Sequence, residues 1–204
     1  MHGDGGFGEI DRGHEGRLRD RTRHRKRVPG RASVRHMTDI DDVSGLAAKV
    51  DLLLAHREIE QKIYRMGYAL EGGDFEMVGS LLRHATFGAD MIGRKVFTGQ
   101  AEITAQYART NITYPGKGRA TREMYDNVVV DIDLATGTAR STTMYTVAQQ
   151  IPGTDAPFAL LVAGRYVDEW ACIEGEWHFT DRFIEVQFKN NLNSHMHTGS
   201  QPYN

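Results

Sequence analysis

The C-terminal half of the chain contains four long extended segments joined by very short links, and this feature most constrains the fold. The links DLATGT, PGTDAP and IEGE contain the glycine, proline and acidic residues that are typical of hairpin turns. Because links this short join neighbouring strands of opposite direction, the segments are expected to form an antiparallel meander. The predicted strands span residues 119–133, 138–151, 158–172 and 177–188.

Helical patterns precede these strands. The first predicted helix carries its apolar residues on one stripe, and Gly72 and Gly73 end it. Asp74 suits the N-terminus of a second, shorter helix. The stripe consists of Leu52, Ile59, Ile63, Met66 and Leu70. Helices are predicted at 46–71, 74–83 and 100–111, and short extended pieces at 85–93 and 95–99. The fold class is therefore α+β, with helices packed against a strongly curved, mainly antiparallel sheet.

The length and the charge distribution define the expected domain organisation. The chain has 204 residues, of which 40% are hydrophobic, which suits one core. Residues 1–36 hold ten Lys and Arg against five Asp and Glu, whereas residues 37–204 hold fifteen against twenty-two. We therefore expect a basic, disordered extension over 1–42, one folded domain over 43–190 and a polar, irregular tail over 191–204.

The basic extension allows three interpretations. An arginine-rich run attracts phosphate and would suit a nucleic acid or a membrane surface. Translation could instead begin at Met37, which heads the acidic stretch MTDIDDVSG, or the extension could be an idle solvated tail. We predict that the protein binds neither a nucleic acid nor a membrane.

Other sequence features argue against several classes of protein. No apolar run reaches the length of a membrane span, and no secretory signal is present, so a cytoplasmic location is expected. Cys172 is the single cysteine and cannot form an internal disulfide. His195 and His197 have no neighbouring acid or cysteine that would complete a metal site. With no phosphate loop or dinucleotide motif either, the sequence predicts no metal and no cofactor.

Three polar residues share one face of the first helix. Tyr64, Tyr68 and Glu71 are spaced by four and three residues, next to the aliphatic stripe. A carboxylate in the last turn of a helix lies at the negative end of the helix dipole, which is unfavourable. Either water offsets this cost, or Glu71 faces a pocket and has a function there.

Two predicted strands place charged residues among apolar ones. By alternation, Glu123, Tyr125 and Asn127 share one face of the first strand of the meander with Val129. On the last strand Arg182 shares a face with aliphatic residues, so it either extends to solvent at an edge or pairs with an acid. Phenols that could donate hydrogen bonds to a ligand oxygen are those of Tyr64, Tyr68, Tyr125 and Tyr145.

Five short motifs in this order resemble the SnoaL-like branch of the nuclear transport factor 2-like, ketosteroid-isomerase-like superfamily. They are YALEGGDFEMVGSLL, GRKVFTGQAEI, TREMYDN, AGRYVDEW and GEWHFTDRFIEV, within residues 46–188. The resemblance implies a conical half-barrel of helices and curved sheet around an apolar cavity, and self-association as a dimer or trimer. Many enzymes of this superfamily transfer protons on apolar substrates, although fold alone does not fix function.

The resemblance also implies site residues. Glu71 falls where dehydrochlorinase-like members have an aspartate, Glu123 falls where they have a histidine, and Asn127 follows four residues later. Arg182 matches an arginine on the last strand. Because Glu123 replaces the histidine and Met66 replaces a lysine, dehydrochlorination is not expected. Two close carboxylates could share a proton and act as base and acid, or form a structural ion cluster with the arginine.

Two functions remain open from the sequence. The first is a cofactor-independent lyase or isomerase that transfers a proton on a small hydrophobic substrate, with Glu71, Glu123 and Arg182 as catalytic residues. The substrate would be polyketide-, steroid- or terpenoid-like, and Tyr64, Tyr68, Tyr125, Asn127 and Tyr145 would contact it. The second is a non-catalytic ligand-binding or accessory protein, for which the missing histidine argues.

Overall fold

A computed structural model describes residues 43–92 and 96–197. The predicted extension over residues 1–42 lies outside the described residues. The predicted elements are present in the predicted order: helices α1 (Val43–Gly72), α2 (Phe75–Leu81) and α3 (Gly99–Thr110), and strands β1 (Thr86–Ala89), β2 (Phe97–Thr98), β3 (Thr121–Asp133), β4 (Thr138–Gln149), β5 (Ala159–Ile173) and β6 (Glu176–Lys189). None of the described helices combines the length and apolar character of a membrane span.

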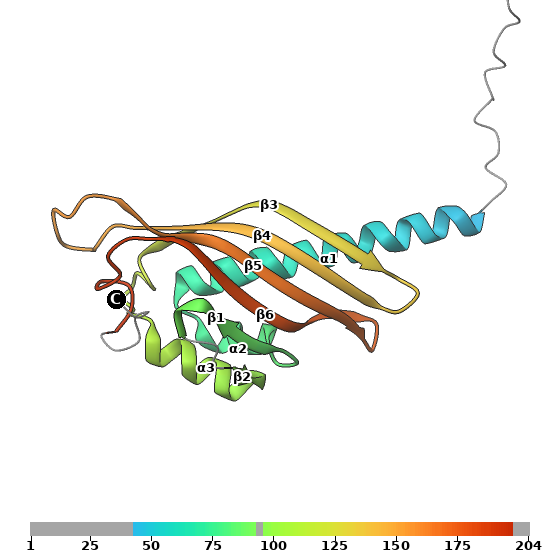
Figure 1. Cartoon of the computed structure of the whole chain (residues 1–204), viewed down its shortest axis with the longest axis horizontal. Helices are drawn as coiled ribbons and strands as arrows, with labels where there is room; N and C mark the ends of the chain where they lie inside the picture. The colour runs from blue at the N-terminus through green and yellow to red at the C-terminus, as the bar shows by residue number, and fades with distance from the viewer. Residues whose placement is uncertain (1–42, 93–95, 198–204) are drawn as a thin grey trace, which may run out of the picture. The chain divides into compact units, whose positions relative to one another are not determined.

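The strands form one curved sheet of six strands in the order β2-β1-β6-β5-β4-β3 (Figure 1). Strands β3 to β6 pair as the predicted antiparallel meander. Strand β1 pairs in parallel with β6, and β2 pairs antiparallel with β1 at the edge of the sheet. The three helices pack on the sheet, so the α+β class and the open half-barrel are confirmed.

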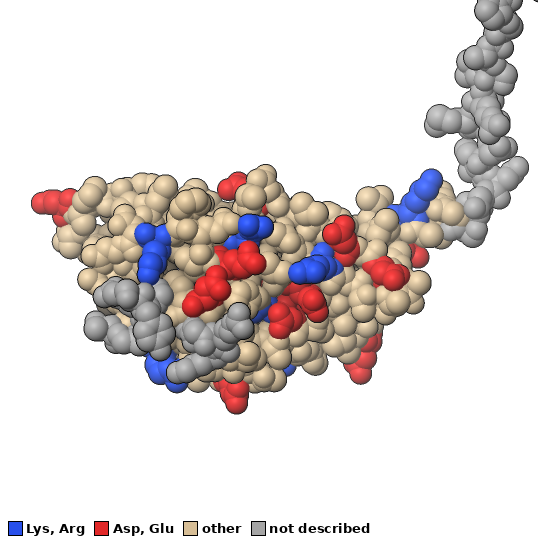
Figure 2. Space-filling model, in the orientation of Figure 1, with Lys and Arg blue, Asp and Glu red and all other residues tan. Residues whose placement is uncertain are grey.

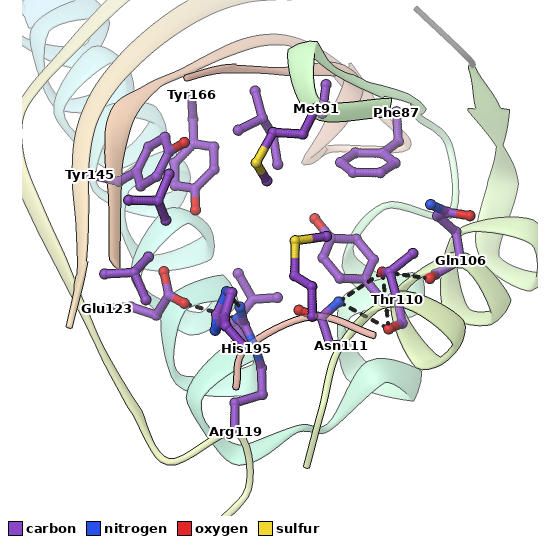
Figure 3. A pocket seen from close by; sticks show the side chains of 17 residues that line it. Phe87, Met91, Gln106, Thr110, Asn111, Arg119, Glu123, Tyr145, Tyr166 and His195 are labelled. Atoms are coloured by element: carbon purple, nitrogen blue, oxygen red, sulfur yellow. Dashed lines mark hydrogen bonds and ion pairs between the residues drawn. The ribbon is translucent and has the colours of Figure 1, made fainter. Parts of the chain in front are cut away.

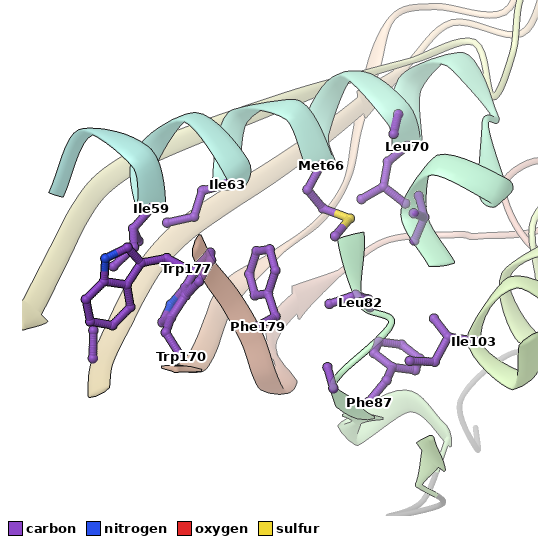
Figure 4. Close-up of a cluster of buried hydrophobic side chains, with 14 of the residues drawn as sticks. Ile59, Ile63, Met66, Leu70, Leu82, Phe87, Ile103, Trp170, Trp177 and Phe179 are labelled. Atoms are coloured by element: carbon purple, nitrogen blue, oxygen red, sulfur yellow. The ribbon is translucent and has the colours of Figure 1, made fainter. Parts of the chain in front are cut away.

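The core lies between α1 and the concave face of the sheet. Ile59, Ile63 and Met66 are fully buried along α1, as the predicted stripe requires. Leu52 is 42% exposed, near the N-terminal turns of α1 that extend beyond the strands (Figure 1). Figure 4 shows the aromatic residues from β5 and β6 packed under this stripe. The large core residues include Trp170, Trp177, Phe179, Leu82, Phe87 and Ile103.

A β-bulge in β3 changes the face assignment that simple alternation predicts. The register with β4 shifts between Asp126 and Val129, and Asn127 has a φ of 48°. An extra residue in one strand reverses which side chains point inward beyond it. Glu123 and Tyr125 therefore point inward, but Asn127 and Val129 are exposed, and Val128 packs against the core.

Charged residues on the face seen in Figure 2 are mixed in sign. Lys and Arg lie among Asp and Glu there, without a continuous basic patch on the described part of that face.

Candidate functional site

A cavity lies where the concave sheet meets α3, the end of α1 and the C-terminal segment (Figure 3). Its volume is about 70 Å³. That space holds several waters, since a water needs roughly 10–15 Å³ on the same measure, but a polycyclic ligand requires side chains to move. Met91 and Met196 are flexible wall residues that could do so. The apolar lining consists of Leu70, Phe87, Ala89, Met91, Val147, Val162, Ile184 and Met196.

The polar part of the cavity centres on Arg119. Its Nη1 donates to Oε1 of Glu123 at 2.9 Å, and its Nη2 lies 2.7 Å from Nε2 of His195. All three side chains line the cavity, and those of Arg119 and Glu123 are 6% and 1% exposed. One guanidinium thus holds a carboxylate from β3 and an imidazole from the C-terminal segment side by side.

The hydrogen bond between Arg119 and His195 fixes the tautomer of the imidazole. A guanidinium can only donate, so Nε2 of His195 must accept and the ring proton must lie on Nδ1. Burial and the positive charge of Arg119 lower the pKa of His195 to about 2, so the ring is neutral at pH 7. Its Nδ1 is buried and has no partner among the described residues. His195 is therefore an unpaired N–H donor.

Glu123 supplies the complementary acceptor. Burial raises the pKa of its carboxyl group, Arg119 opposes this shift, and the negative charge of Glu71 adds to it. Oε2 of Glu123 is buried without a partner among the described residues. A carboxylate with one free oxygen in an apolar setting is suited to accept a proton.

Tyrosines complete the polar lining. Tyr107, Tyr145 and Tyr166 line the cavity, and the rings of Tyr145 and Tyr166 stack with centroids 4.3 Å apart. Burial raises the pKa of Tyr107 to about 12 and raises the pKa of Tyr166 well above its usual value, so both phenols stay protonated. The hydroxyl of Tyr107 is buried without a partner among the described residues and can donate to a ligand.

Comparisons with known proteins identify the family. The model of the SnoaL-like domain matches residues 51–182. The chain belongs to the SnoaL-like family. A search of curated proteins finds no match to this SnoaL-like chain.

Solved structures share the SnoaL-like fold at low sequence identity. An NTF2-like protein with a cystatin-like fold from Novosphingobium aromaticivorans is 20% identical, with a TM-score of 0.58 over 72% of this chain and 91% of that one. A putative scytalone dehydratase from the same organism is 16% identical, with a TM-score of 0.54 over 70% and 90%. A type 2 hexachlorocyclohexane dehydrochlorinase is 13% identical, with a TM-score of 0.56 over 70% and 91%. These likenesses support the fold and leave the reaction open.

Glu71, the predicted partner of Glu123, is not among the residues that line the cavity of this SnoaL-like domain. Its Oε1 accepts from the backbone N–H of Glu123 at 2.7 Å, and its Oε2 lies 3.4 Å from Nη1 of Arg122. Glu71 lines an outer groove between α1 and β3 together with Tyr64, Tyr68, Tyr125 and Glu123, and Glu123 thus borders both this groove and the cavity. The structure therefore brings the two acids together through a backbone amide.

Arg182 is fully buried, so of the two sequence interpretations the pairing with an acid is correct. Its Nε and Nη2 donate to the two carboxylate oxygens of Asp168 at 2.7 and 2.8 Å. The guanidinium lies under the ring of Tyr166, 4.6 Å from its centroid. Arg182 is not among the residues that line the cavity, so it supports the cavity wall from behind.

The predicted ligand-contacting residues divide into two groups. Tyr145 lines the cavity, whereas Tyr125 lines the outer groove and packs edge-on against Tyr166 of the cavity wall. Tyr64 and Tyr68 are 38% and 74% exposed on the outer groove. Asn127 is exposed at the bulge, where its side-chain nitrogen lies 3.2 Å from the sulfur of Met144, because the bulge turns it away from the cavity.

Sequence reasoning missed His195 and Arg119. Residues 190–197 cross the end of the cavity. The amide of Ile112 donates to the carbonyl of His195, and the amide of His197 donates to that of Thr110, both at 3.0 Å. The apolar residues Leu192 and Met196, which are buried, were the available signal in NNLNSHMH. Among the described residues no cluster of three potential metal ligands occurs.

Proposed function

We propose that this SnoaL-like domain binds a small hydrophobic molecule in the cavity and transfers a proton on it without a cofactor, as a lyase or isomerase does. The observation that carries the proposal is the free, buried Oε2 of Glu123, which has a raised pKa and adjoins apolar walls. Such a carboxylate accepts a carbon-bound proton more readily than a solvated one does.

The proposed reaction assigns a role to each polar group. Glu123 removes a proton from a carbon next to a carbonyl group, and its carboxyl returns the proton at another position. The phenol of Tyr107 donates a hydrogen bond to the ligand, and Tyr145, whose hydroxyl donates to the carbonyl of Glu185, contacts the ligand with its ring. Arg119 orients the carboxylate, and Arg182 holds the wall behind Tyr166.

The proposed ligand is an oxygen-bearing, polyketide-, steroid- or terpenoid-like molecule. The apolar side chains along the cavity support a hydrophobic ligand, and the small resting volume favours one or two rings over four unless the methionines move. Glu71, Tyr64 and Tyr68 would then act outside the reaction, as supports of β3 or as surface residues.

Deuterium exchange tests this proposal without knowledge of the natural substrate. The full-length protein is incubated in D₂O with 2-tetralone or a 3-keto steroid, and deuterium uptake next to the carbonyl is followed by mass spectrometry. We expect uptake above the buffer rate, lost in Glu123→Gln and kept in Glu169→Gln, which changes an exposed acid on β5. Uptake that is unchanged in Glu123→Gln would overturn the role of this residue.

A ligand-binding protein without catalysis is the second candidate function. The ion pair between Glu123 and Arg119 favours it, because a cation at 2.9 Å makes a carboxylate a weaker base. In this case the ketones raise the melting temperature of the protein by mass action but take up no deuterium above the buffer rate.

We also propose that the protein self-associates as a dimer or trimer. Exposed apolar side chains near the N-terminus of α1 support this, on the side opposite the core stripe: Leu46, Val50, Leu53 and Leu54. Light scattering on the full-length protein after gel filtration measures the mass, and a monomer at micromolar concentration would contradict self-association.

A further inference from the structure

The C-terminal segment contributes the imidazole of His195, of which one ring nitrogen is hydrogen-bonded within the described structure and the other is not. Nε2 of His195 accepts from Arg119 at 2.7 Å, and the proton must therefore be on Nδ1. The side chain is buried, and Nδ1 has no partner among the described residues. Buried N–H groups in folded proteins nearly always have a partner, so an unpaired one at a cavity wall indicates a group that a ligand or water supplies.

The same guanidinium also binds a residue with an unpaired acceptor. Oε2 of Glu123 is also buried and has no partner within the described part of the chain, and both residues bind terminal nitrogens of the same guanidinium. Figure 3 shows Glu123, Arg119 and His195 gathered on one wall of the cavity. The chemical complement of this donor and this acceptor is an oxygen acceptor next to an acidic hydrogen, and a neutral, enolisable carbonyl compound carries both.

We propose that His195 is a catalytic hydrogen-bond donor that binds the carbonyl oxygen of an enolisable ketone while Glu123 removes the adjacent proton. The C–H electron pair becomes the carbon–carbon double bond of the enolate, and the former carbonyl π electrons move to the oxygen that Nδ1–H holds. The proton stays on Glu123 until it returns to carbon. This inference rests on the proposed function and names its substrate class and its oxyanion donor.

The neutral state of His195 suits this role. Arg119 faces its Nε2 and is a permanent cation, so protonation of the ring would place two positive charges together and break the hydrogen bond. The acid that adjoins Arg119 and His195 is Glu123, and its carboxylate binds Arg119 rather than the imidazole ring. A neutral imidazole donates to a developing oxyanion without giving up its proton.

Two substitutions of His195 distinguish hydrogen-bond donation to the ligand from structural support of Arg119. In His195→Asn the amide nitrogen can occupy the place of Nδ1 and keep the donor. In His195→Gln the amide oxygen can occupy the place of Nε2 and keep the contact with Arg119, while the donor near Nδ1 is lost. With 2-tetralone in D₂O, we expect His195→Gln to lower the exchange rate about 10²- to 10³-fold, and His195→Asn to keep it within about tenfold.

The outcomes distinguish this inference from the proposed function. If both variants exchange at the wild-type rate while Glu123→Gln does not, His195 is not the donor and the role of Glu123 stands. A larger loss in His195→Asn than in His195→Gln assigns His195 to positioning of Arg119 and overturns the inference. If the wild type itself gives no exchange, the proposed function fails.

A spectroscopic measurement tests the donor without turnover. Two-bond ¹H–¹⁵N spectra of the histidine-labelled, full-length protein, with the His195 signal assigned by its loss in His195→Gln, report the tautomer. We expect a proton on Nδ1 whose resonance moves downfield when 2-naphthol, a stable mimic of the enol, binds. A proton on Nε2, or an Nδ1 proton that 2-naphthol leaves unmoved, would overturn the inference.

Discussion

The side chain of Glu71 accepts a hydrogen bond from the backbone N–H of Glu123, with 2.7 Å between Oε1 and N. This contact joins the end of α1 to the start of β3 and fixes the position of the cavity acid. The carboxylate of Glu71 also lies 3.4 Å from Arg122, on the outer side of the sheet. An acid at a helix C-terminus is here stabilised by a strand amide, which offsets the unfavourable helix dipole.

Loss of this contact should destabilise the fold. We expect Glu71→Ala to lower the free energy of unfolding by about 1–3 kcal/mol, because the amide of Glu123 would lose its partner. Glu71→Gln keeps an oxygen acceptor and should cost less than about 1 kcal/mol. Arg122→Ala removes an exposed ion pair and should cost less still. Urea denaturation measures all three, and equal values for Glu71→Ala and Arg122→Ala would refute this role.

The buried pair of Arg182 and Asp168 should be intolerant of partial removal. Both side chains are fully buried, so Arg182→Met leaves an uncompensated carboxylate and should cost about 3–5 kcal/mol of unfolding free energy. Combining Arg182→Met with Asp168→Leu removes both charges and should recover part of this loss. Chemical denaturation of the two single variants and the double variant measures the coupling. Additive losses would show that the charges do not depend on one another.

Gly118 allows the turn that precedes Arg119 to pack closely against the C-terminal end of α1. A Cβ at this glycine would lie 2.3 Å from the carbonyl oxygen of Glu71, which accepts from the amide of Arg119 at 2.9 Å. Gly116 has a similar positive φ but open space around it. We expect Gly118→Ala to cost about 1–3 kcal/mol more than Gly116→Ala, because overpacking is added to backbone strain. Thermal denaturation of both variants is the comparison, and equal costs would contradict the close packing.

His195 should make the protein sensitive to mild acid. Its folded pKa is lowered, so the unfolded chain binds a proton that the folded chain does not, and stability present above about pH 6.5 is lost as the pH falls. Below this pH the loss approaches about 1.4 kcal/mol for each pH unit. Urea denaturation at pH 5, 6 and 7 should show a flatter dependence in His195→Gln. The same slope in both proteins would show that the imidazole takes a proton in the folded state.

The pH dependence of proton transfer should follow the titration of Glu123 and not that of His195. The carboxylate of Glu123 is the active form, and burial raises its pKa, so deuterium exchange should rise through this raised pKa and then stay level. No further step near pH 6.5 is expected, because His195 remains neutral throughout. A fall in exchange as the pH rises through neutrality would point to an acid as the active form.

The sequence by itself determined the fold. The alternation in residues 119–188 with short hairpin links, and the apolar stripe through Ile59, Ile63 and Met66, depend on local periodicity and turn chemistry, so they can be read without coordinates. The motif order added the SnoaL-like family, which the family model confirms. The family resemblance predicted Glu123 as a site residue, and alternation holds at its position because it precedes the bulge.

Only the tertiary structure decided the site. The bulge at Asn127 reverses the faces of β3, and alternation alone cannot reveal an inserted residue. The partners Asp168 and His195 are brought to Arg182 and Arg119 by contacts 14 and 76 residues apart in sequence. Such pairings depend on strand register and on where the C-terminal segment packs, and these are set by the buried surface of the whole domain rather than by any local pattern.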